Sequence, residues 1–323
     1  MVLSNAQLLT TLTGAAEIQE NNGVLVPLRF GHHVRENVYP EGTRFHPATY
    51  QTSGVVSRFI TNSEALAFSY AVSTLSATQS FDVWANNVFY ATQPCSPIEG
   101  RVEVKLPQGE KLVTIYFPHH EDGKIFDVTL DEGASFANAP ANKYKVLFIG
   151  DSITHGSTSV HASMTYAHQL ARALDIEMVN QGIGGERFNA AAVDNELNFT
   201  PDLISVSYGT NNWSHDTSYE EMEAGANAHF QALRDKYPNT KIAAILPIWR
   251  ADDYLIKPVG PFENSHKIVR EAAERVGATV IDGLTLVPHV TDVYADARLH
   301  PSEFGFQFYA ENLLPHFKKL LVK

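Results

Sequence analysis

A short apolar run that ends in Gly-Asp-Ser, over residues 145–152, restricts the possible folds more than any other stretch of the chain. The four apolar residues Val146 to Ile149 predict a buried strand of a parallel sheet, because such strands are covered on both faces. Open α/β sheets bind their ligands at the carboxyl ends of the strands. Ser152 lies at that end and is therefore a candidate nucleophile, although Gly-Asp-Ser is also ordinary turn and helix-cap chemistry.

Strand-like and helix-like segments alternate after residue 142. The strand candidates are residues 146–149, 177–180, 203–208, 241–247 and 279–281, and the helix candidates are residues 163–174, 219–236, 264–276 and 305–321. This alternation predicts an α/β domain with a parallel five-stranded sheet and helices on both faces.

The chain before residue 133 has a different pattern of short alternating or β-branched segments. These strand candidates are residues 25–30, 55–60, 66–72, 80–85, 102–106, 111–117 and 125–130. Turn-forming residues at 107–109 and 121–123 suit hairpins. The pattern predicts an antiparallel, jelly-roll-like β-sandwich. Because the small, proline-containing segment 133–142 separates the two patterns, we predict an accessory β domain over residues 1–138 and a catalytic α/β domain over residues 139–323.

Composition excludes several classes of protein. A formal net charge of -12 and the lack of a Lys/Arg cluster argue against nucleic acid or an anionic membrane as the main partner. Cys95 is the single cysteine, which excludes an internal disulfide and a zinc site built on several thiolates, and we expect it to be a small buried side chain. No signal sequence or apolar run of about 18 residues is evident. The expected location is therefore the cytoplasm, unless an export signal has been removed.

Three further loops carry residues that serine chemistry needs. Residues 180–187 are glycine-rich, residues 208–213 contain an Asn pair, and residues 296–305 hold an acid and an imidazole before the last helix. A serine hydroxyl must lose its proton to a base, and an acid holds that base in one tautomer. Fixed N–H donors stabilise the oxyanion, each by about a hundred- to a thousandfold in rate. The four loops together predict a serine hydrolase that needs no metal or other cofactor.

The four blocks resemble those of the SGNH or GDSL hydrolase superfamily. The matching residues are Gly150-Asp151-Ser152-Ile153, Asn180-Gln181-Gly182-Ile183-Gly184-Gly185, Gly209-Thr210-Asn211 and His300-Pro301 with an upstream Asp. The resemblance covers about residues 143–323 and implies a flavodoxin-like three-layer fold. It also implies that Ser152 is the nucleophile, that His300 is the base, and that the oxyanion hole consists of the N–H groups of Ser152 and Gly185 and the side-chain amide of Asn211.

The spacing of the acid departs from the family pattern. The superfamily usually has Asp-X-X-His, whereas Asp296 lies four residues before His300. We predict Asp296 as the acid, with Asp292 or a backbone carbonyl as alternatives. We expect His155, one turn after the nucleophile, to be a rim residue.

A β domain ahead of an SGNH domain resembles two-domain carbohydrate esterases that remove O-acetyl groups from polysaccharides, which is an argument from architecture. The expected substrate is therefore an acetylated oligosaccharide or another small ester. Trp213 and Trp249 are predicted substrate-binding residues, with core packing as the alternative. We expect Arg250 to pair with a nearby carboxylate.

The sequence is also compatible with other functions. The chain could be a lipase-like or aryl esterase, an inactive carbohydrate-binding protein, or an enzyme that transfers the acyl group to a second sugar. The β domain could also pair protomers into a homo-oligomer. His32-His33 and His119-His120-Glu121-Asp122 have no third ligand at a metal-site spacing, so we expect solvated loops there.

Overall fold

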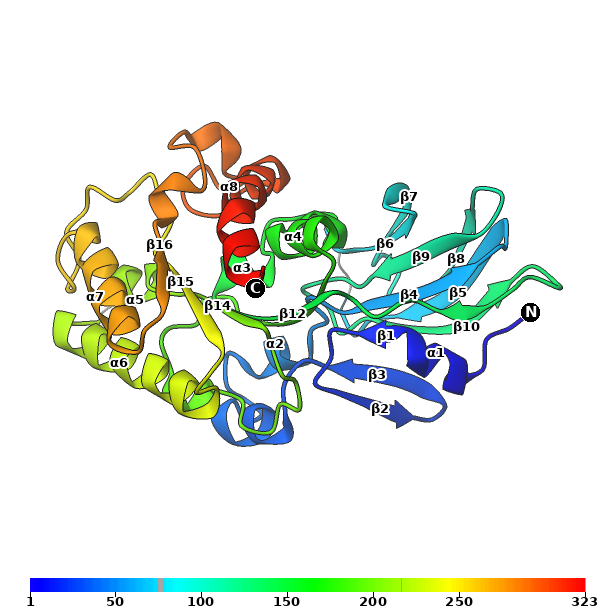
Figure 1. The fold of residues 1–323 in the computed structure, drawn as a ribbon, viewed down its shortest axis with the longest axis horizontal. Coiled ribbons are helices and arrows are strands. Elements are labelled where there is room, and N and C mark those ends of the chain that lie inside the picture. Colours follow the sequence, from blue (N-terminus) through cyan, green and yellow to red (C-terminus); the bar gives the residue numbers. More distant parts are fainter. Residues whose placement is uncertain (75–77, 216, 323) are drawn as a thin grey trace.

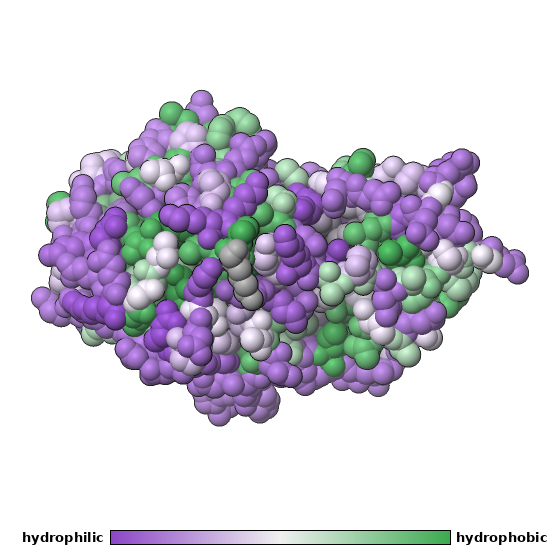
Figure 2. Space-filling model, in the orientation of Figure 1, coloured by the Kyte–Doolittle hydropathy of each residue, from purple (hydrophilic) through white to green (hydrophobic). Residues whose placement is uncertain are grey.

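The structure is a computed structural model that describes residues 1–323 except 75–77, 216 and 323. A β-rich body formed by the first part of the chain lies beside an α/β body formed by the second part (Figure 1). Hydrophilic residues cover most of the face in Figure 2, and apolar residues form small groups between them. None of the helices in the described part of the chain has the length and apolar character needed to cross a membrane.

The β-rich body is an antiparallel sandwich, as the sequence pattern predicted. Its elements are α1 (Asn5–Thr11), β1 (Leu12–Thr13), β2 (Glu17–Asn21), β3 (Val24–Leu28), the π-helical turn η1 (Val34–Val38), α2 (His46–Tyr50), β4 (Val56–Thr61), β5 (Ala65–Ala71), β6 (Ser80–Ala85), β7 (Val88–Pro94), β8 (Glu99–Lys105), β9 (Lys111–Tyr116), β10 (Lys124–Leu130) and β11 (Ala137–Asn138). One sheet has the order β1-β4-β9-β6-β7, with β11 also paired to β4, and the other has the order β10-β5-β8. Buried aliphatic and aromatic side chains, among them Phe59, Phe68 and Phe81, fill the body.

Two predicted hairpins in this body are wrong. Residues 107–109 connect β8 to β9, and residues 121–123 lie between β9 and β10, but each of these pairs is divided between the two sheets. Both connections therefore cross the sandwich. The tight hairpins are β2–β3, turned at Asn22 and Gly23, and β6–β7, turned at Asn86 and Asn87. All four turn residues have positive φ, which is the conformation that a two-residue hairpin favours.

The α/β body contains the parallel five-stranded sheet that the sequence predicted. Its elements are β12 (Tyr144–Gly150), α3 (Ser152–His155), η2 (Ala162–Met164), α4 (Tyr166–Leu174), β13 (Ile176–Gly182), η3 (Ala190–Ala192), β14 (Leu203–Ser207), α5 (Thr210–Ser214), α6 (Tyr219–Lys236), β15 (Lys241–Ile245), α7 (Phe262–Arg275), β16 (Thr279–Ile281), η4 (Gly283–Thr285), η5 (Thr291–Val293) and α8 (Glu303–Leu321). The strand order β13-β12-β14-β15-β16 is flavodoxin-like, and the order reverses beside β12.

Helices cover both faces of this sheet, which explains the unbroken apolar run in β12. Val146 and Phe148 belong to the core beneath α4 and α8, whereas Leu147 and Ile149 belong to the core beneath α6 and α7 (Figure 1). Successive side chains of a strand point to opposite faces, so a strand covered twice is apolar at every position. The carboxyl end of β12 is therefore fixed from both sides.

Candidate active site

The nucleophile turn joins β12 to α3. A Cβ atom at Gly150 would lie 2.2 Å from Thr154 Oγ1 and 2.7 Å from the Ser207 carbonyl oxygen, so only glycine fits there. Asp151 is the N-cap of α3, where its Oδ1 accepts the Ile153 N–H at 3.0 Å. Burial raises the pKa of the Asp151 carboxyl to about 6. The turn places Ser152 at the first position of the short helix, largely buried but still 7% exposed.

Ser152, His300 and Asp296 form a continuous chain of hydrogen bonds. Ser152 Oγ lies 2.8 Å from His300 Nε2, and His300 Nδ1 lies 2.7 Å from Asp296 Oδ2. A carboxylate on Nδ1 holds the ring proton there and leaves Nε2 free to accept the hydroxyl proton. The three side chains therefore have the geometry of a nucleophile, a base and an acid that orients the base.

The loop between Asp296 and His300 accommodates the extra residue of this chain. Ala297 adopts a left-handed conformation with φ 52°, and Asp296 Oδ1 then accepts the backbone N–H groups of Arg298, Leu299 and His300 at 2.8–3.0 Å. Partial burial alone would raise the pKa of Asp296, but the Leu299 N–H, His300 and the other donors outweigh it and lower this pKa to about 2. Asp292 lies exposed on η5, and His300 Nδ1 contacts Asp296 instead.

The predicted oxyanion donors lie on the turns that follow β12, β13 and β14. In the described part of the chain, the N–H groups of Ser152 and Gly185 have no hydrogen-bond partner. Asn211 Nδ2 donates one hydrogen to the Glu186 carbonyl oxygen at 3.0 Å. A carboxamide nitrogen carries two hydrogens, so a second one remains for a ligand. Gly185 has a φ of 82°, which permits the sharp turn that presents its N–H.

His155 supports the loop that carries Gly185, and the prediction of a rim position is wrong. Its ring is 1% exposed, its Nδ1 accepts the Gly184 N–H at 3.3 Å, and its Nε2 lies 2.8 Å from the His119 carbonyl oxygen. The His120 ring stacks on it at a centroid distance of 4.1 Å. Burial lowers the pKa of His155 well below its ordinary value, so the ring is neutral and can accept at Nδ1. His119 is buried as well, which corrects the prediction of a solvated loop.

Arg29 fixes the same loop from the β-rich body, and sequence reasoning did not find it. The side chain is fully buried and donates to the carbonyl oxygens of Asn180 and Gly182, at the end of β13. It also donates to the carbonyl oxygens of Ala48 and Gln51 in its own body. Burial lowers the pKa of this guanidinium to about 9, which leaves it charged at neutral pH.

Glu186 is a second buried ionisable group beside the site. Its carboxyl accepts the hydroxyl of Tyr208 at 2.6 Å and the hydroxyl of Tyr39, which comes from the β-rich body. Burial raises the pKa of Glu186 to about 7. The sequence held no signal for this cluster, because Tyr39 and Glu186 are 147 residues apart along the chain.

The two tryptophans predicted to bind substrate differ in solvent exposure. Trp213 is fully buried, its Nε1 donates to the Gly260 carbonyl oxygen at 3.0 Å, and Arg250 lies over its ring at 4.7 Å. It offers no face to a ligand, so the prediction that it binds substrate is wrong. Arg250 pairs with Asp252 at 2.6 Å, as expected. Trp249 is half-buried and stacks on His289 at 5.5 Å, and its contact with substrate stays a prediction.

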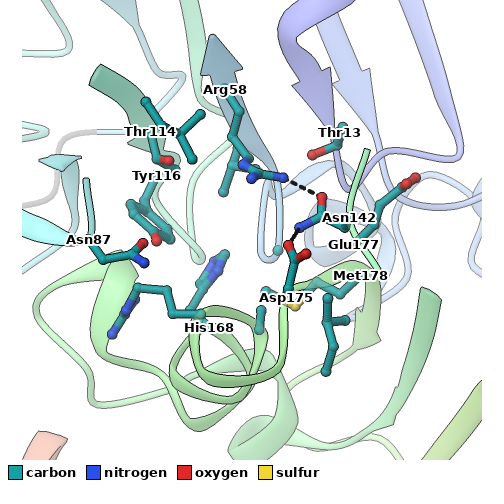
Figure 3. Close-up of a pocket in the computed structure, with 16 residues that line it drawn as sticks. Thr13, Arg58, Asn87, Thr114, Tyr116, Asn142, His168, Asp175, Glu177 and Met178 are labelled. Atoms are coloured by element: carbon teal, nitrogen blue, oxygen red, sulfur yellow. Dashed lines mark hydrogen bonds between the residues drawn. The ribbon is translucent and has the colours of Figure 1, made fainter. Parts of the chain in front are cut away.

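A separate cavity of about 180 Å³ lies between the two bodies (Figure 3). Its walls include Tyr116 from β9 and His168 from α4, and hydrogen bonds from Arg58 to Asn142 and from Asn142 to Asp175 cross one side of it. None of the predicted catalytic residues lines this cavity. Among the described residues, no group of three or more His, Cys, Asp or Glu side chains is placed to hold a metal ion.

SGNH hydrolases are defined by a flavodoxin-like sheet and four site residues. In this chain the serine, the glycine turn and the asparagine follow β12, β13 and β14, and the histidine precedes α8. Residues 148–308 match the model of the GDSL-like Lipase/Acylhydrolase family. The chain belongs to this family through its α/β body. No curated protein matches the chain by sequence.

Solved structures share the fold over both bodies. A salicylyl-acyltransferase, SsfX3, from a tetracycline biosynthetic pathway is 23% identical, with a TM-score of 0.80 over 100% of this chain and 99% of that one. A family two carbohydrate esterase from Cellvibrio japonicus is 18% identical, with a TM-score of 0.69 over 99% and 97%. The acetyl xylan esterase Est2A from the rumen bacterium Butyrivibrio proteoclasticus is 17% identical, with a TM-score of 0.62 over 83% and 89%. At these identities the likeness establishes the fold alone.

Proposed function

We propose that this chain is a serine esterase that hydrolyses short acyl esters of carbohydrates, with O-acetyl esters as the main substrates. The hydrogen-bonded chain from Ser152 through His300 to Asp296 is the observation that carries the proposal. Membership of the acylhydrolase family supports ester chemistry, and the carbohydrate esterases of the same two-body fold support the sugar substrate.

The reaction follows from the positions of these groups. Ser152 Oγ attacks the ester carbonyl carbon while His300 Nε2 takes the hydroxyl proton. The N–H groups of Ser152 and Gly185 and the free amide hydrogen of Asn211 stabilise the oxyanion. The C–O bond to the alcohol then breaks, and His300 gives its proton to the leaving oxygen. Water, deprotonated by His300, attacks the acyl-enzyme and releases the acid and Ser152.

Acetate release from 4-nitrophenyl acetate and from acetylated xylan, mannan and small sugars tests the proposal. Wild type is expected to release acetate, and Ser152→Ala should lose at least about 10³-fold in kcat, since the nucleophile is gone. Retained hydrolysis in Ser152→Ala would refute Ser152 as the nucleophile. Activity on aryl or long-chain esters without any on sugars would favour the lipase-like or aryl esterase, whereas acetate appearing on a sugar acceptor would indicate acyl transfer. Binding of sugars without turnover of any ester would favour an inactive binding protein.

A further inference from the structure

The glycine turn that carries the Gly185 N–H has a cation on its outer side. Arg44 comes from the β-rich body, and a Cβ atom at Gly185 would lie 2.7 Å from its Nη2 and 3.2 Å from its Cζ. The guanidinium therefore lies against the Cα of Gly185. A Cβ atom at the neighbouring Gly184 would lie 3.9 Å from Ser152 Cβ. Arg44 and Ser152 thus flank the same two-glycine turn.

Arg44 has no carboxylate partner within 4.0 Å among the residues that the structure describes. Its side chain is exposed, and its guanidinium lies 5.5 Å from the ring centroid of Phe45. Arg35 and Arg250 are instead paired with Glu17 and Asp252. In a chain with a net charge of -12, a cation that remains unpaired against the glycine turn is free to bind a ligand.

The segment around Arg44 is anchored on both sides. Before it, the Tyr39 hydroxyl donates to Glu186, and the Tyr39 carbonyl oxygen lies 2.8 Å from His46 Nδ1. After it, the Ala48 carbonyl oxygen accepts from the buried Arg29 at 2.7 Å. These contacts hold the backbone of the segment against the α/β body, so the origin of the Arg44 side chain is fixed relative to the glycine turn.

A hollow of about 410 Å³ adjoins Glu186 and Arg187, which follow the turn, although neither Arg44 nor Ser152 is on its wall. Phe45 and Arg187 are on its wall, and Arg187 Nη1 donates to Thr217 Oγ1 at 3.1 Å. The two carboxylates of the same wall are already hydrogen-bonded. Glu186 accepts from tyrosine hydroxyls, and Glu221 accepts the Ser218 N–H at 2.9 Å. The unpaired charge at this edge of the site is therefore positive.

We propose that Arg44 is a specificity-determining residue that binds a carboxylate of the ester substrate. A guanidinium presents a planar pair of N–H donors that matches a carboxylate. The inference rests on the proposed function, because it concerns the substrate of the same serine. Arg44 takes no part in bond breaking. It selects which esters reach Ser152.

Two matched pairs of esters test this, one for each side of the ester bond. Mono-4-nitrophenyl succinate and its methyl ester differ by a charge on the acyl group. In 4-acetoxybenzoate and its methyl ester, the charge is on the leaving alcohol. Initial rates for wild type, Arg44→Gln and Arg44→Glu give kcat/KM for all four esters. Arg101→Gln is the control, because Arg101 lies exposed on β8, in the sheet farthest from the α/β body (Figure 1).

Wild type is expected to prefer the anionic member of at least one pair by about tenfold, which is the usual worth of a charge-assisted hydrogen bond. The pair that responds shows which side of the ester carries the carboxylate. Arg44→Gln should abolish the preference through KM, Arg44→Glu should reverse it, and Arg101→Gln should keep it. The preference should also weaken at about 1 M NaCl, since salt screens an exposed charge.

Three results would overturn the inference in different ways. An equal charge preference in wild type and Arg44→Gln, with esters hydrolysed by both, would refute the role of Arg44 and leave the proposed function standing. If wild type hydrolyses none of the four esters but still releases acetate from 4-nitrophenyl acetate or acetylated sugars, this inference alone is refuted. No hydrolysis of any of these substrates would refute the proposed function and this inference with it.

Discussion

Replacing Asp296 with asparagine separates its effect on His300 from its effect on the loop. In Asp296→Asn, the carboxamide oxygen can still accept the three backbone N–H groups that bind Asp296 Oδ1. The amide nitrogen would then face His300 Nδ1, where it can only donate. The ring proton must therefore move to Nε2, the atom that lies 2.8 Å from Ser152 Oγ. In that tautomer the imidazole cannot accept the hydroxyl proton.

The expected loss is about 10³- to 10⁴-fold in kcat, since the wrong tautomer of a triad histidine removes general-base catalysis but leaves the oxyanion donors. This corresponds to about 4–5.5 kcal/mol of transition-state stabilisation. KM should change little in Asp296→Asn, because the backbone donors keep an acceptor. The free energy of unfolding at neutral pH should fall somewhat, because the ionised carboxyl, whose pKa is lowered on folding, is lost. Asp296→Ala removes that acceptor too and should also lower the free energy of unfolding by about 1–2 kcal/mol, since water replaces it only in part.

Steady-state hydrolysis of 4-nitrophenyl acetate measures the catalytic effect, and urea unfolding measures the effect on stability. Asp292→Asn is the matched control, because Asp292 lies exposed on η5 in the same loop region and should leave kcat within about twofold. The reasoning fails if Asp296→Asn keeps more than about a tenth of the wild-type kcat, or if Asp292→Asn is the more damaging change.

The pH dependence of stability gives an independent check on Asp296. The pKa of this carboxyl falls from 3.8 to about 2 on folding, so the folded state favours the ionised form. Its contribution to stability is present above about pH 4 and is lost as the pH falls toward about 2. Asp296→Asn should remove this part of the acid unfolding curve, and an unchanged curve below about pH 4 would contradict the assignment.

Three further changes test other parts of the site. Arg29→Met leaves backbone carbonyls of both bodies without a donor, so the free energy of unfolding, measured in urea, should fall by about 3–5 kcal/mol. A loss below about 1 kcal/mol would show that Arg29 contributes little to holding the two bodies together. Burial raises the pKa of Glu186 from 4.5 to about 7, so stability should fall as the pH rises through this window, and Glu186→Gln should flatten the profile; parallel profiles would contradict this. Ala297 has a φ of 52°, a conformation that glycine adopts easily and valine does not. Ala297→Gly should therefore leave the free energy of unfolding unchanged or raise it by up to about 1 kcal/mol, whereas Ala297→Val should lower it and reduce kcat. Equal effects of both changes would argue against the left-handed turn.

The α/β body could be predicted closely because its signals are local. The helix predicted over residues 219–236 is α6 with the same bounds, since a capping box at Ser218 and Glu221 marks its start. The strand predicted over residues 279–281 is β16. The β-rich body was harder. The turn residues at 107–109 look the same in a hairpin and in a connection between two sheets, because the choice depends on which strands pair far along the chain.

The catalytic positions could be predicted because sheet topology brings the ends of parallel strands together whatever the loops do. Ser152, Gly185 and Asn211 each follow a neighbouring strand, and this order was visible in the sequence. The sequence did not decide between Asp296 and Asp292 as the acid, because that choice depends on the left-handed turn at Ala297. An alanine carries no signal for that conformation, which usually favours glycine or asparagine.

The largest omission concerns the β-rich body, which the sequence presented as an accessory domain. Arg29 holds the end of the strand before the glycine turn, the His119 carbonyl oxygen is within hydrogen-bond distance of the histidine that accepts from Gly184, and Arg44 lies against Gly185. An oxyanion donor accelerates a reaction only when it is fixed before the substrate arrives. The glycines that let this turn approach a ligand also leave it flexible, so its rigidity must come from outside the turn. Arg29 and the His119 carbonyl oxygen, which belong to the β-rich body, supply such contacts, so this body forms part of the active site.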